Sequence, residues 1–268
     1  MVRTAFFAAL LLAAAPAAAQ DEPPVDALAP DASADDAAAE EPAPLGATGA
    51  FEISGEAALL SDYRFRGVSR SDEDPSAQAG LMVSHESGLY GGARGTILSG
   101  LDSFRLRDPA FQDLGHAQLD LYAGFRREIG DGFEVDGGLM VYVFAGGDGA
   151  TDYVEPYASL SYLIGPVLAS AGAKYAPAQA GTGDEAMLYL YGQVDIAIPF
   201  RPWSFSLQAG HQDWGRFGGY WSWSVGGEYR LGLDGLPDAD IGLRYVDTDL
   251  PGIAGQDAGL VLSVEIGF

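Results

Sequence analysis

Charged side chains at two-residue spacing are the feature of this sequence most able to do chemistry. In one such stretch Asp62, Arg64 and Arg66 alternate with Tyr63 and Phe65. Facing rows of guanidinium and carboxylate groups on a wet surface can form a narrow constriction that admits small polar solutes and sets charge selectivity. The same groups could instead pair with one another as structural ion pairs. The candidate solute-contacting residues are Asp62, Arg64, Arg66, Arg94, Asp120, Glu155, Lys174, Asp195 and Arg244.

Histidine chemistry has little support in this sequence. The three histidines, His85, His116 and His211, are scattered, and none is accompanied by the Gly-x-Ser-x-Gly pattern of a serine nucleophile. His116, at the start of a predicted strand, is the one candidate base for hydrolysis of a lipid ester. Scattered histidines without any cysteine offer no metal-ligand spacing either. We therefore expect no enzyme, no metal site and no cofactor.

Alternation of polar and apolar residues is what would place the charges on one surface. Successive side chains of an extended strand point to opposite faces. The C-terminal stretch shows this most clearly, because Leu260, Leu262, Val264, Ile266 and Phe268 are apolar and the intervening positions 263, 265 and 267 are polar or small. Such a strand fits the core of a β-sandwich or the wall of a transmembrane barrel, whose outer face contacts lipid.

About twelve stretches of this kind follow one another between residues 50 and 268. Charge on every second residue is difficult to fit into a two-layer soluble core, whereas it suits a barrel with lipid outside and water inside. The predicted connections also alternate between long and mostly shorter ones, as do the external loops and periplasmic turns of outer-membrane barrels. We predict an all-β fold, a single transmembrane antiparallel up-and-down β-barrel whose two chain ends lie in the periplasm.

Closure of such a barrel makes further predictions about side chains. The last two strands and the first become neighbours, so Arg64, Arg66 and Arg244 are expected to form a basic patch in the outer half of the lumen. Residues 104–114, within the longest connection, could plug or gate the opening. Aromatic residues near strand ends on the outward face would form interfacial girdles. These are Tyr63, Phe65, Tyr175, Trp221, Tyr229, Tyr245 and Phe268.

The N-terminal residues differ in composition from the rest of the chain. Residues 1–19 contain Arg3, an apolar run and an Ala-rich cleavage site, which is typical of a secretory signal peptide. Residues 20–49 are rich in Ala, Pro and acids, have no Lys or Arg, and are predicted to be a disordered acidic segment. A net charge of -24 argues against a nucleic-acid partner. Without cysteine there is no disulfide framework.

The segment 61–69, Ser-Asp-Tyr-Arg-Phe-Arg-Gly-Val-Ser, resembles the opening motif of the TorF-type porin family, together with Pro75 and Gln78. His-Glu-Ser-Gly-Leu-Tyr-Gly-Gly at 85–92 and Tyr-Val-Asp-Thr-Asp at 245–249 extend the resemblance over the barrel. Ser76 departs from it, since a small apolar residue is expected there. The resemblance implies an outer-membrane barrel acting as a channel, and it brings no established substrate or site residues.

These observations lead to one expected function and one alternative. We expect a porin-like channel of the bacterial outer membrane that passes small hydrophilic solutes by passive diffusion. Outer-membrane lipid and the barrel assembly machinery, which would read the strand ending at Phe268, are the expected partners. The alternative is a non-conducting barrel with a structural, adhesive or lipid-directed enzymatic role.

Overall fold

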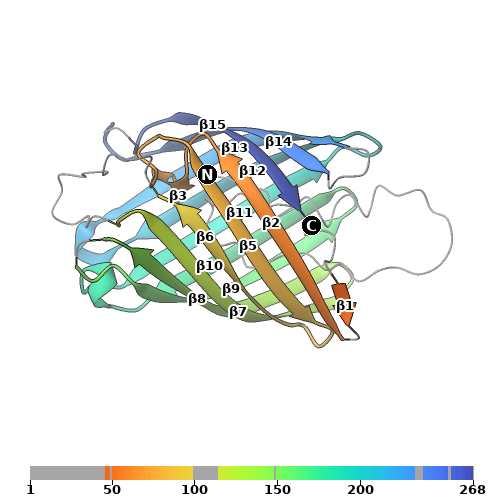
Figure 1. Cartoon of the computed structure of the whole chain (residues 1–268), viewed down its shortest axis with the longest axis horizontal. Helices are drawn as coiled ribbons and strands as arrows, with labels where there is room; N and C mark the ends of the chain where they lie inside the picture. The colour runs from red at the N-terminus through yellow and green to blue at the C-terminus, as the bar shows by residue number, and fades with distance from the viewer. Residues whose placement is uncertain are drawn as a thin grey trace.

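The computed structural model describes residues 46–48, 50–98, 114–147, 149–232, 238–252 and 255–267, and these form a closed antiparallel β-barrel of twelve strands (Figure 1). Each strand pairs with its neighbours along the chain, and pairing of the first with the last closes the barrel. The predicted fold is confirmed. The wall strands are β2 (Phe51–Leu60), β5 (Ser76–His85), β6 (Leu89–Ile97), β7 (Ala117–Gly130), β8 (Phe133–Ala145), β9 (Tyr153–Ile164), β10 (Val167–Ala176), β11 (Met187–Ala197), β12 (Trp203–Asp213), β13 (Gly219–Leu231), β14 (Ala239–Thr248) and β15 (Gly259–Gly267).

A short additional strand, β1 (Gly46–Thr48), pairs antiparallel with the start of β2. It falls inside the range that the sequence assigns to the acidic segment, so the ordered pairing begins slightly before residue 50. The predicted signal peptide, the rest of the acidic segment and Phe268 lie outside the described residues, as does most of the proposed plug at 104–114.

The two ends of the barrel differ in the length of their connections. At one end, called here the turn end, residues 131–132 join β7 to β8 and residues 165–166 join β9 to β10. At the other, the loop end, residues 61–75 follow β2 and residues 177–186 follow β10. β1 and the C-terminal end of β15 both lie at the turn end (Figure 1). This is the arrangement that the alternating spacing predicted, except that the connection after the ninth wall strand, residues 214–218, is short.

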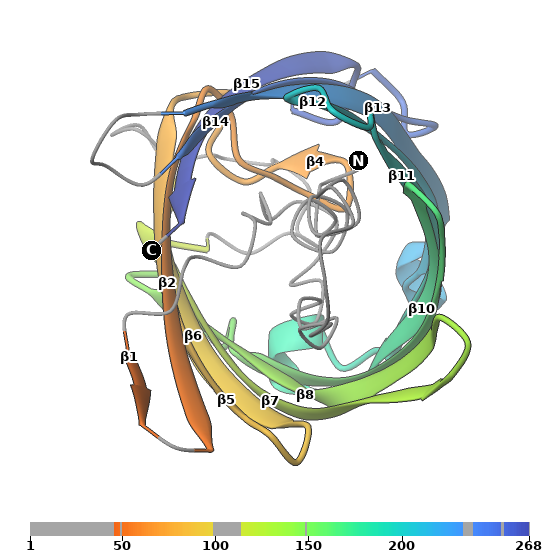
Figure 2. The ribbon, with the colours of Figure 1, turned by 90° about the vertical axis from the view of Figure 1, so that its right-hand side faces the viewer.

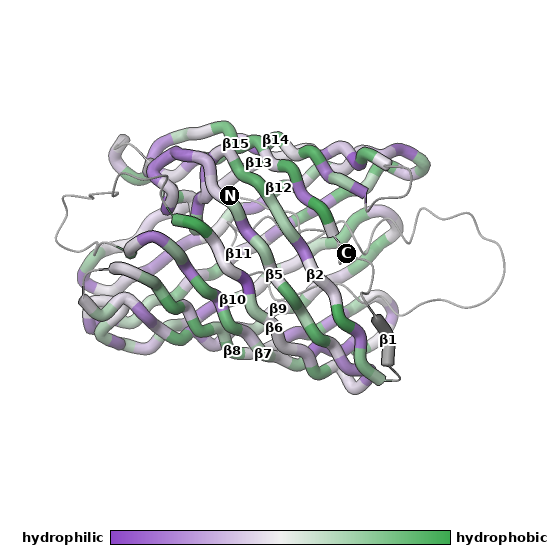
Figure 3. The backbone as a smooth tube through the Cα atoms, in the orientation of Figure 1, coloured by the Kyte–Doolittle hydropathy of each residue, from purple (hydrophilic) through white to green (hydrophobic). Residues whose placement is uncertain are grey.

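The outer wall is apolar along the strands. Large side chains there remain exposed in the isolated chain, as for Leu243 (54%) and Leu262 (52%). Hydrophilic and hydrophobic residues alternate along the strands in Figure 3, because each strand turns one face outward and one inward. An uninterrupted apolar belt of this kind far exceeds the patches that soluble proteins expose, and it matches the lipid-facing surface of a membrane barrel.

Aromatic side chains mark both rims of this belt. Tyr175, Trp221 and Tyr245 are exposed near the loop end, and Trp203 packs on Tyr229 at 4.9 Å between ring centroids near the turn end. Tyr63 and Phe65, also predicted for the outer girdle, are instead buried inside the barrel. That part of the prediction is wrong, because the chain leaves the wall after Leu60.

Several inward tyrosines lie flat against the inner wall, over glycines of a neighbouring strand. A Cβ at Gly172 would lie 2.4 Å from the hydroxyl oxygen of Tyr191, the residue directly opposite on β11. A Cβ at Gly138 would lie 2.3 Å from the hydroxyl oxygen of Tyr157. Glycine thus makes room for a ring along the wall, and the ring covers backbone that glycine leaves bare. Rings held in this way project less into the lumen.

Helical structure in the described chain amounts to two short 3-10 turns, η1 (Ala180–Thr182) and η2 (Gly215–Phe217), both in loops at the loop end. Within the described ranges no helix has the length and apolar character needed to cross a bilayer.

Candidate functional site: a hairpin inside the barrel

Residues 61–75 do not extend the wall but fold back into the lumen as a hairpin. Its two short strands, β3 (Arg64–Phe65) and β4 (Val68–Ser69), pair only with each other, and β4 is seen inside the ring of wall strands in Figure 2. At the tip, Arg66 (φ 50°) and Gly67 (φ 95°) both have positive φ, as the central residues of a tight type I′ turn require. We call residues 61–75 the luminal hairpin.

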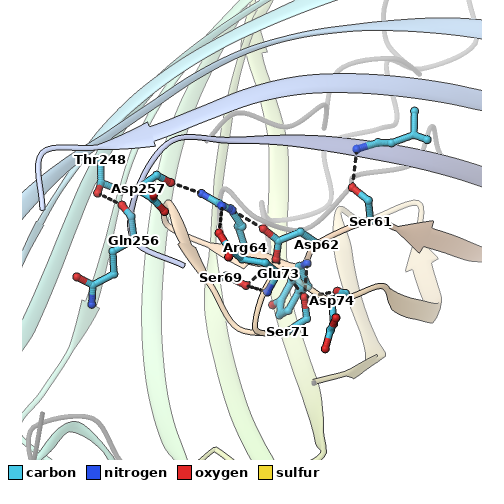
Figure 4. Close-up of polar contacts among 12 residues, drawn as sticks. Ser61, Asp62, Arg64, Ser69, Ser71, Glu73, Asp74, Thr248, Gln256 and Asp257 are labelled. Carbon is cyan, nitrogen blue, oxygen red and sulfur yellow. Dashed lines mark hydrogen bonds and ion pairs between the residues drawn. The ribbon is translucent and has the colours of Figure 1, made fainter. Parts of the chain in front are cut away.

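The base of the luminal hairpin is organised around Asp62. Its carboxylate accepts hydrogen bonds from the hydroxyls of Ser69 (2.6 Å) and Ser71 (3.1 Å) and forms an ion pair with Arg64 (Figure 4). Arg64 also donates to the backbone oxygen of Asp257, at 2.6 Å, in the loop between β14 and β15. A buried carboxylate satisfied by several donors fixes the conformation of the chain that surrounds it.

The tip of the hairpin is bound to the wall by Arg66. One guanidinium nitrogen donates to Glu155 of β9 and another to Gln212 of β12, both at 2.6 Å. The guanidinium carbon lies 4.5 Å from the ring centroid of Tyr189 of β11. Burial alone would lower the pKa of Arg66, but the Glu155 carboxylate and nearby tyrosines outweigh it, so the pKa is raised and the charge is retained.

The flank of the hairpin packs on an aromatic half of the lumen. Phe65 meets Tyr142 of β8 edge-on, with 5.7 Å between ring centroids. The guanidinium carbon of Arg70 lies 3.3 Å from the centroid of the Phe65 ring. Arg70 also donates to Gln118 of β7 at 2.7 Å. The buried aromatic side chains that share this cluster are Tyr63, Phe65, Tyr90, Tyr122, Tyr142, Phe144, Tyr153 and Tyr157.

Gly67 brings the hairpin against the opposite part of the wall. A Cβ at this position would lie 2.5 Å from Cγ2 of Thr248 on β14 and 2.9 Å from Cβ of Ser222 on β13. Together with the contacts of Arg66 and Arg70, this close approach means that the hairpin reaches across the lumen rather than lining one side. It narrows the barrel at the loop end.

Other charged groups of the inner wall are paired across strands. Arg94 of β6 donates to Glu56 of β2 at 2.6 Å, passing over Gly80 of the intervening β5. Arg244 of β14 donates to Glu228 of β13 at 3.1 Å. Ion pairs of this kind keep charge inside the barrel while limiting the cost of removing each group from bulk water.

The structure places all nine predicted solute-contacting residues inside the barrel, in two groups. Asp62, Arg64 and Arg66 belong to the luminal hairpin and not, as predicted, to the first wall strand. The remaining six project inward from wall strands; they are Arg94 (β6), Asp120 (β7), Glu155 (β9), Lys174 (β10), Asp195 (β11) and Arg244 (β14).

The predicted basic patch is not formed. Arg64 pairs with Asp62 and Glu73, Arg66 with Glu155, and Arg244 with Glu228. The prediction placed the two hairpin arginines on the wall, whereas the hairpin carries them into the lumen beside carboxylates. Sequence reasoning also missed three residues that fix the hairpin in place, Arg70 of the hairpin itself and its wall partners Gln118 and Gln212.

The histidines occupy three separate positions. Nδ1 of His85, the last residue of β5, shares a hydrogen bond of 2.8 Å with the Ser87 hydroxyl in the following turn. His211 of β12 packs on Trp221, with 4.8 Å between ring centroids. His116 precedes β7 and its backbone N–H donates to Ala145. Among the residues that the structure describes, no group of three or more His, Cys, Asp or Glu is placed to hold a metal ion.

Fold and lumen together define the class: a transmembrane β-barrel with a charged interior, narrowed by an inserted hairpin. The family described as "Bacterial protein of unknown function (Gcw_chp)" matches residues 45–261, and the chain belongs to this family. No curated protein matches the sequence.

Solved structures of porins resemble the barrel. The NanC porin superposes with a TM-score of 0.51 at 13% identity, covering 80% of this chain and 97% of that one. The KdgM porin gives a TM-score of 0.47 at 10% identity, covering 81% and 98%. At such low identity, the likeness to the NanC porin shows a shared fold and nothing finer.

Proposed function

We propose that the protein is a channel of the bacterial outer membrane through which small hydrophilic solutes diffuse passively, and that the luminal hairpin limits their size. The observation that carries the proposal is the reversal of polarity across the wall. Side chains such as Leu243 and Leu262 face outward, while their neighbours Arg244 and Ser263 face inward. A wall of this kind separates lipid from an aqueous interior. The resemblance to TorF-type porins agrees with it.

The width of the barrel supports an aqueous path. Eight strands enclose little more than their own side chains, whereas barrels of sixteen or more leave an open channel, and twelve is intermediate. The tyrosines that lie flat over Gly138 and Gly172 leave more of that width free than inward-pointing rings would. Paired charges such as Arg94 with Glu56 add polar groups to the interior beside the aromatic cluster.

In this proposal the loop end faces the exterior and the turn end, with both chain termini, faces the periplasm. Export would depend on the predicted signal peptide at 1–19, and insertion on recognition of the last strand by the assembly machinery. Cell fractionation with external protease tests the orientation. In intact cells we expect the protease to cleave the protein in its loops. Cleavage of the loops only after the outer membrane is opened would contradict the proposed orientation.

The channel itself is tested by conductance of the refolded barrel in a planar lipid bilayer. Folding of the barrel is first verified by its heat-modifiable migration on a gel. Discrete single-channel current steps are then expected in KCl. A barrel that is folded and inserted but passes no current would contradict the proposal.

A second candidate is a non-conducting barrel with a structural, adhesive or lipid-directed role. The observation in its favour is the reach of the hairpin, whose contacts extend to β7, β9, β12 and the face of β13 and β14. If the wild-type barrel is silent and shortening the hairpin produces current, this candidate is preferred. Hydrolysis of a lipid ester that is lost in His116→Ala would support its enzymatic form.

A further inference from the structure

The two halves of the lumen differ in the kind of side chain that they present. Toward β6–β9 the wall carries the aromatic cluster on which the hairpin packs. Toward β12 and β13 it carries short hydroxyl side chains and an amide. We call four of these residues, Ser204, Ser206 and Gln208 of β12 and Ser222 of β13, the hydroxyl track. The hairpin meets this track at Ser222, which lies against Gly67.

Polar atoms of the track lack hydrogen-bond partners within the described protein. The hydroxyl oxygens of Ser204, Ser206 and Ser222 and both amide atoms of Gln208 are buried without one. All four side chains are at least nine-tenths buried, Ser206 and Ser222 to 1% exposure. Because unpaired buried polar groups are rare in folded proteins and costly, these groups call for a hydrogen-bonding partner beyond the described protein, and a polar solute in the lumen supplies that chemistry.

The geometry of the track is that of a row along the direction of transport. Ser204, Ser206 and Gln208 are successive inward residues of one strand, so their Cα atoms are spaced by roughly 6.6–6.8 Å. Ser206 lies opposite Asp195 and Gln208 opposite Gln193 on β11. The Gln193 amide donates to the Asp195 carboxylate at 2.7 Å, which holds that carboxylate at the edge of the row.

Charge near the track does not favour an anion. The Arg244 guanidinium and the Ser206 hydroxyl both lie over Gly226. A Cβ on Gly226 would lie 3.0 Å from Arg244 Nε and 3.2 Å from the Ser206 hydroxyl oxygen. That guanidinium is paired with Glu228 at 3.1 Å. Directly opposite Ser204 and Ser206 on the neighbouring strands stand two carboxylates, Glu228 and Asp195, against the one guanidinium of Arg244. This local excess of negative charge disfavours an anionic solute at these two residues.

From these observations we propose that the hydroxyl track is a binding row for neutral polyhydroxylated solutes, such as polyols and simple sugars, and that it selects them over anions of the same size. Serine hydroxyls and the glutamine amide each donate and accept hydrogen bonds, as does every hydroxyl of a polyol. A row of such groups can exchange partners stepwise with a passing solute. This inference rests on the proposed function, because it requires a solute path through the barrel.

The test compares sorbitol with gluconate, a neutral and an anionic six-carbon polyol, in proteoliposomes that contain the refolded barrel. The track variant combines Ser204→Ala, Ser206→Ala and Gln208→Met. The matched control combines Ser161→Ala and Ser170→Ala, whose hydroxyls bond to each other at 2.9 Å across β9 and β10. Folding of each barrel is verified by heat-modifiable migration, and KCl conductance is recorded as the reference.

Wild-type and control barrels are expected to pass sorbitol faster than gluconate. In the track variant, sorbitol flux at low concentration should fall about fivefold relative to KCl conductance, the effect of losing at least one net hydrogen bond. Conducting barrels whose sorbitol flux is unchanged in the track variant, or in which gluconate passes as fast as sorbitol, overturn the inference alone. A folded wild-type barrel that passes neither KCl nor sorbitol overturns the proposed function and the inference with it.

Discussion

The guanidinium of Arg66, at the tip of a loop, lies 2.6 Å from the Glu155 carboxylate on the far wall of the barrel. Both side chains are buried, and the Tyr142 hydroxyl also donates to the same carboxylate oxygen, at 3.1 Å. The pair therefore holds the luminal hairpin across the lumen. It joins the tip to the wall, whereas the hydrogen bonds around Asp62 act within the hairpin.

Glu155→Gln should release the tip of the hairpin. The substitution keeps the size of the side chain but leaves the Arg66 charge uncompensated, and breaking a buried ion pair in this way costs about 3–5 kcal/mol. We expect the position of the hairpin across the lumen to be destabilised, with larger and more variable single-channel steps in a planar bilayer.

A matched control for this change is Asp240→Asn. It breaks another luminal ion pair, Arg230 with Asp240 at 2.9 Å, which lies near the turn end and away from the hairpin. The control should leave the conductance steps near those of the wild type. Equal effects of the two substitutions would show that the Arg66 contact has no special part in narrowing the lumen.

Gly67→Ala should prevent the hairpin from seating by a different route. The added Cβ would lie 2.5 Å from Thr248 Cγ2. The alanine would also have to adopt φ 95°, which residues with a side chain rarely do. Larger conductance steps are expected, as for Glu155→Gln. Gly218→Ala is the control for alanine at a positive φ in a loop, because Gly218 (φ 89°) lies between β12 and β13 with nothing within 4 Å of an added Cβ. If both variants conduct alike, the steric contact at the tip is not what holds the hairpin.

Much of the wall could be predicted from the sequence because each strand meets two different media. Lipid outside and water or polar groups inside impose a strict two-residue alternation, which remains legible in β14, where Leu243 faces outward and Arg244 inward. The lengths of the connections between strands further predicted which end of the barrel carries the longer loops. These are local signals, so neither the strand count nor the antiparallel order required knowledge of distant contacts.

The hairpin could not be predicted from alternation, because alternation does not say which apolar medium a side chain meets. Tyr63 and Phe65 continue the pattern of β2, yet their apolar surroundings are the rings of Tyr142 and other residues of the aromatic cluster rather than lipid. One signal was present in the sequence. Arg66-Gly67 provides the glycine that a two-residue turn favours, and it interrupts what would otherwise be an overlong strand.

Gly172→Ala tests whether tyrosines held flat over glycines keep the lumen wide. The new Cβ would lie 2.4 Å from the Tyr191 hydroxyl oxygen and 2.5 Å from the carbon that bears it, so the ring must swing away from the wall into the lumen. We expect a smaller single-channel conductance with the barrel still folded. Gly192→Ala, whose Cβ would meet nothing closer than 3.9 Å, is the control for the general effect of replacing glycine in a strand. A conductance that is unchanged in Gly172→Ala would mean that Tyr191 does not border the solute path.

Leu243→Arg tests the assignment of the outer wall to lipid. Leu243 lies midway along β14, opposite Leu262 of β15, and faces outward. An arginine at the midplane of a lipid-facing wall destabilises a barrel by about 2–4 kcal/mol, so the urea midpoint for unfolding from lipid vesicles should fall markedly. Ser263→Arg places the same side chain on the inner face of the adjacent strand, beside the carboxylate of Glu265, and should lower the midpoint far less. If the two substitutions cost the same, or if Leu243→Arg is tolerated, the face that carries Leu243 does not contact hydrocarbon and the membrane-spanning assignment of the wall is wrong.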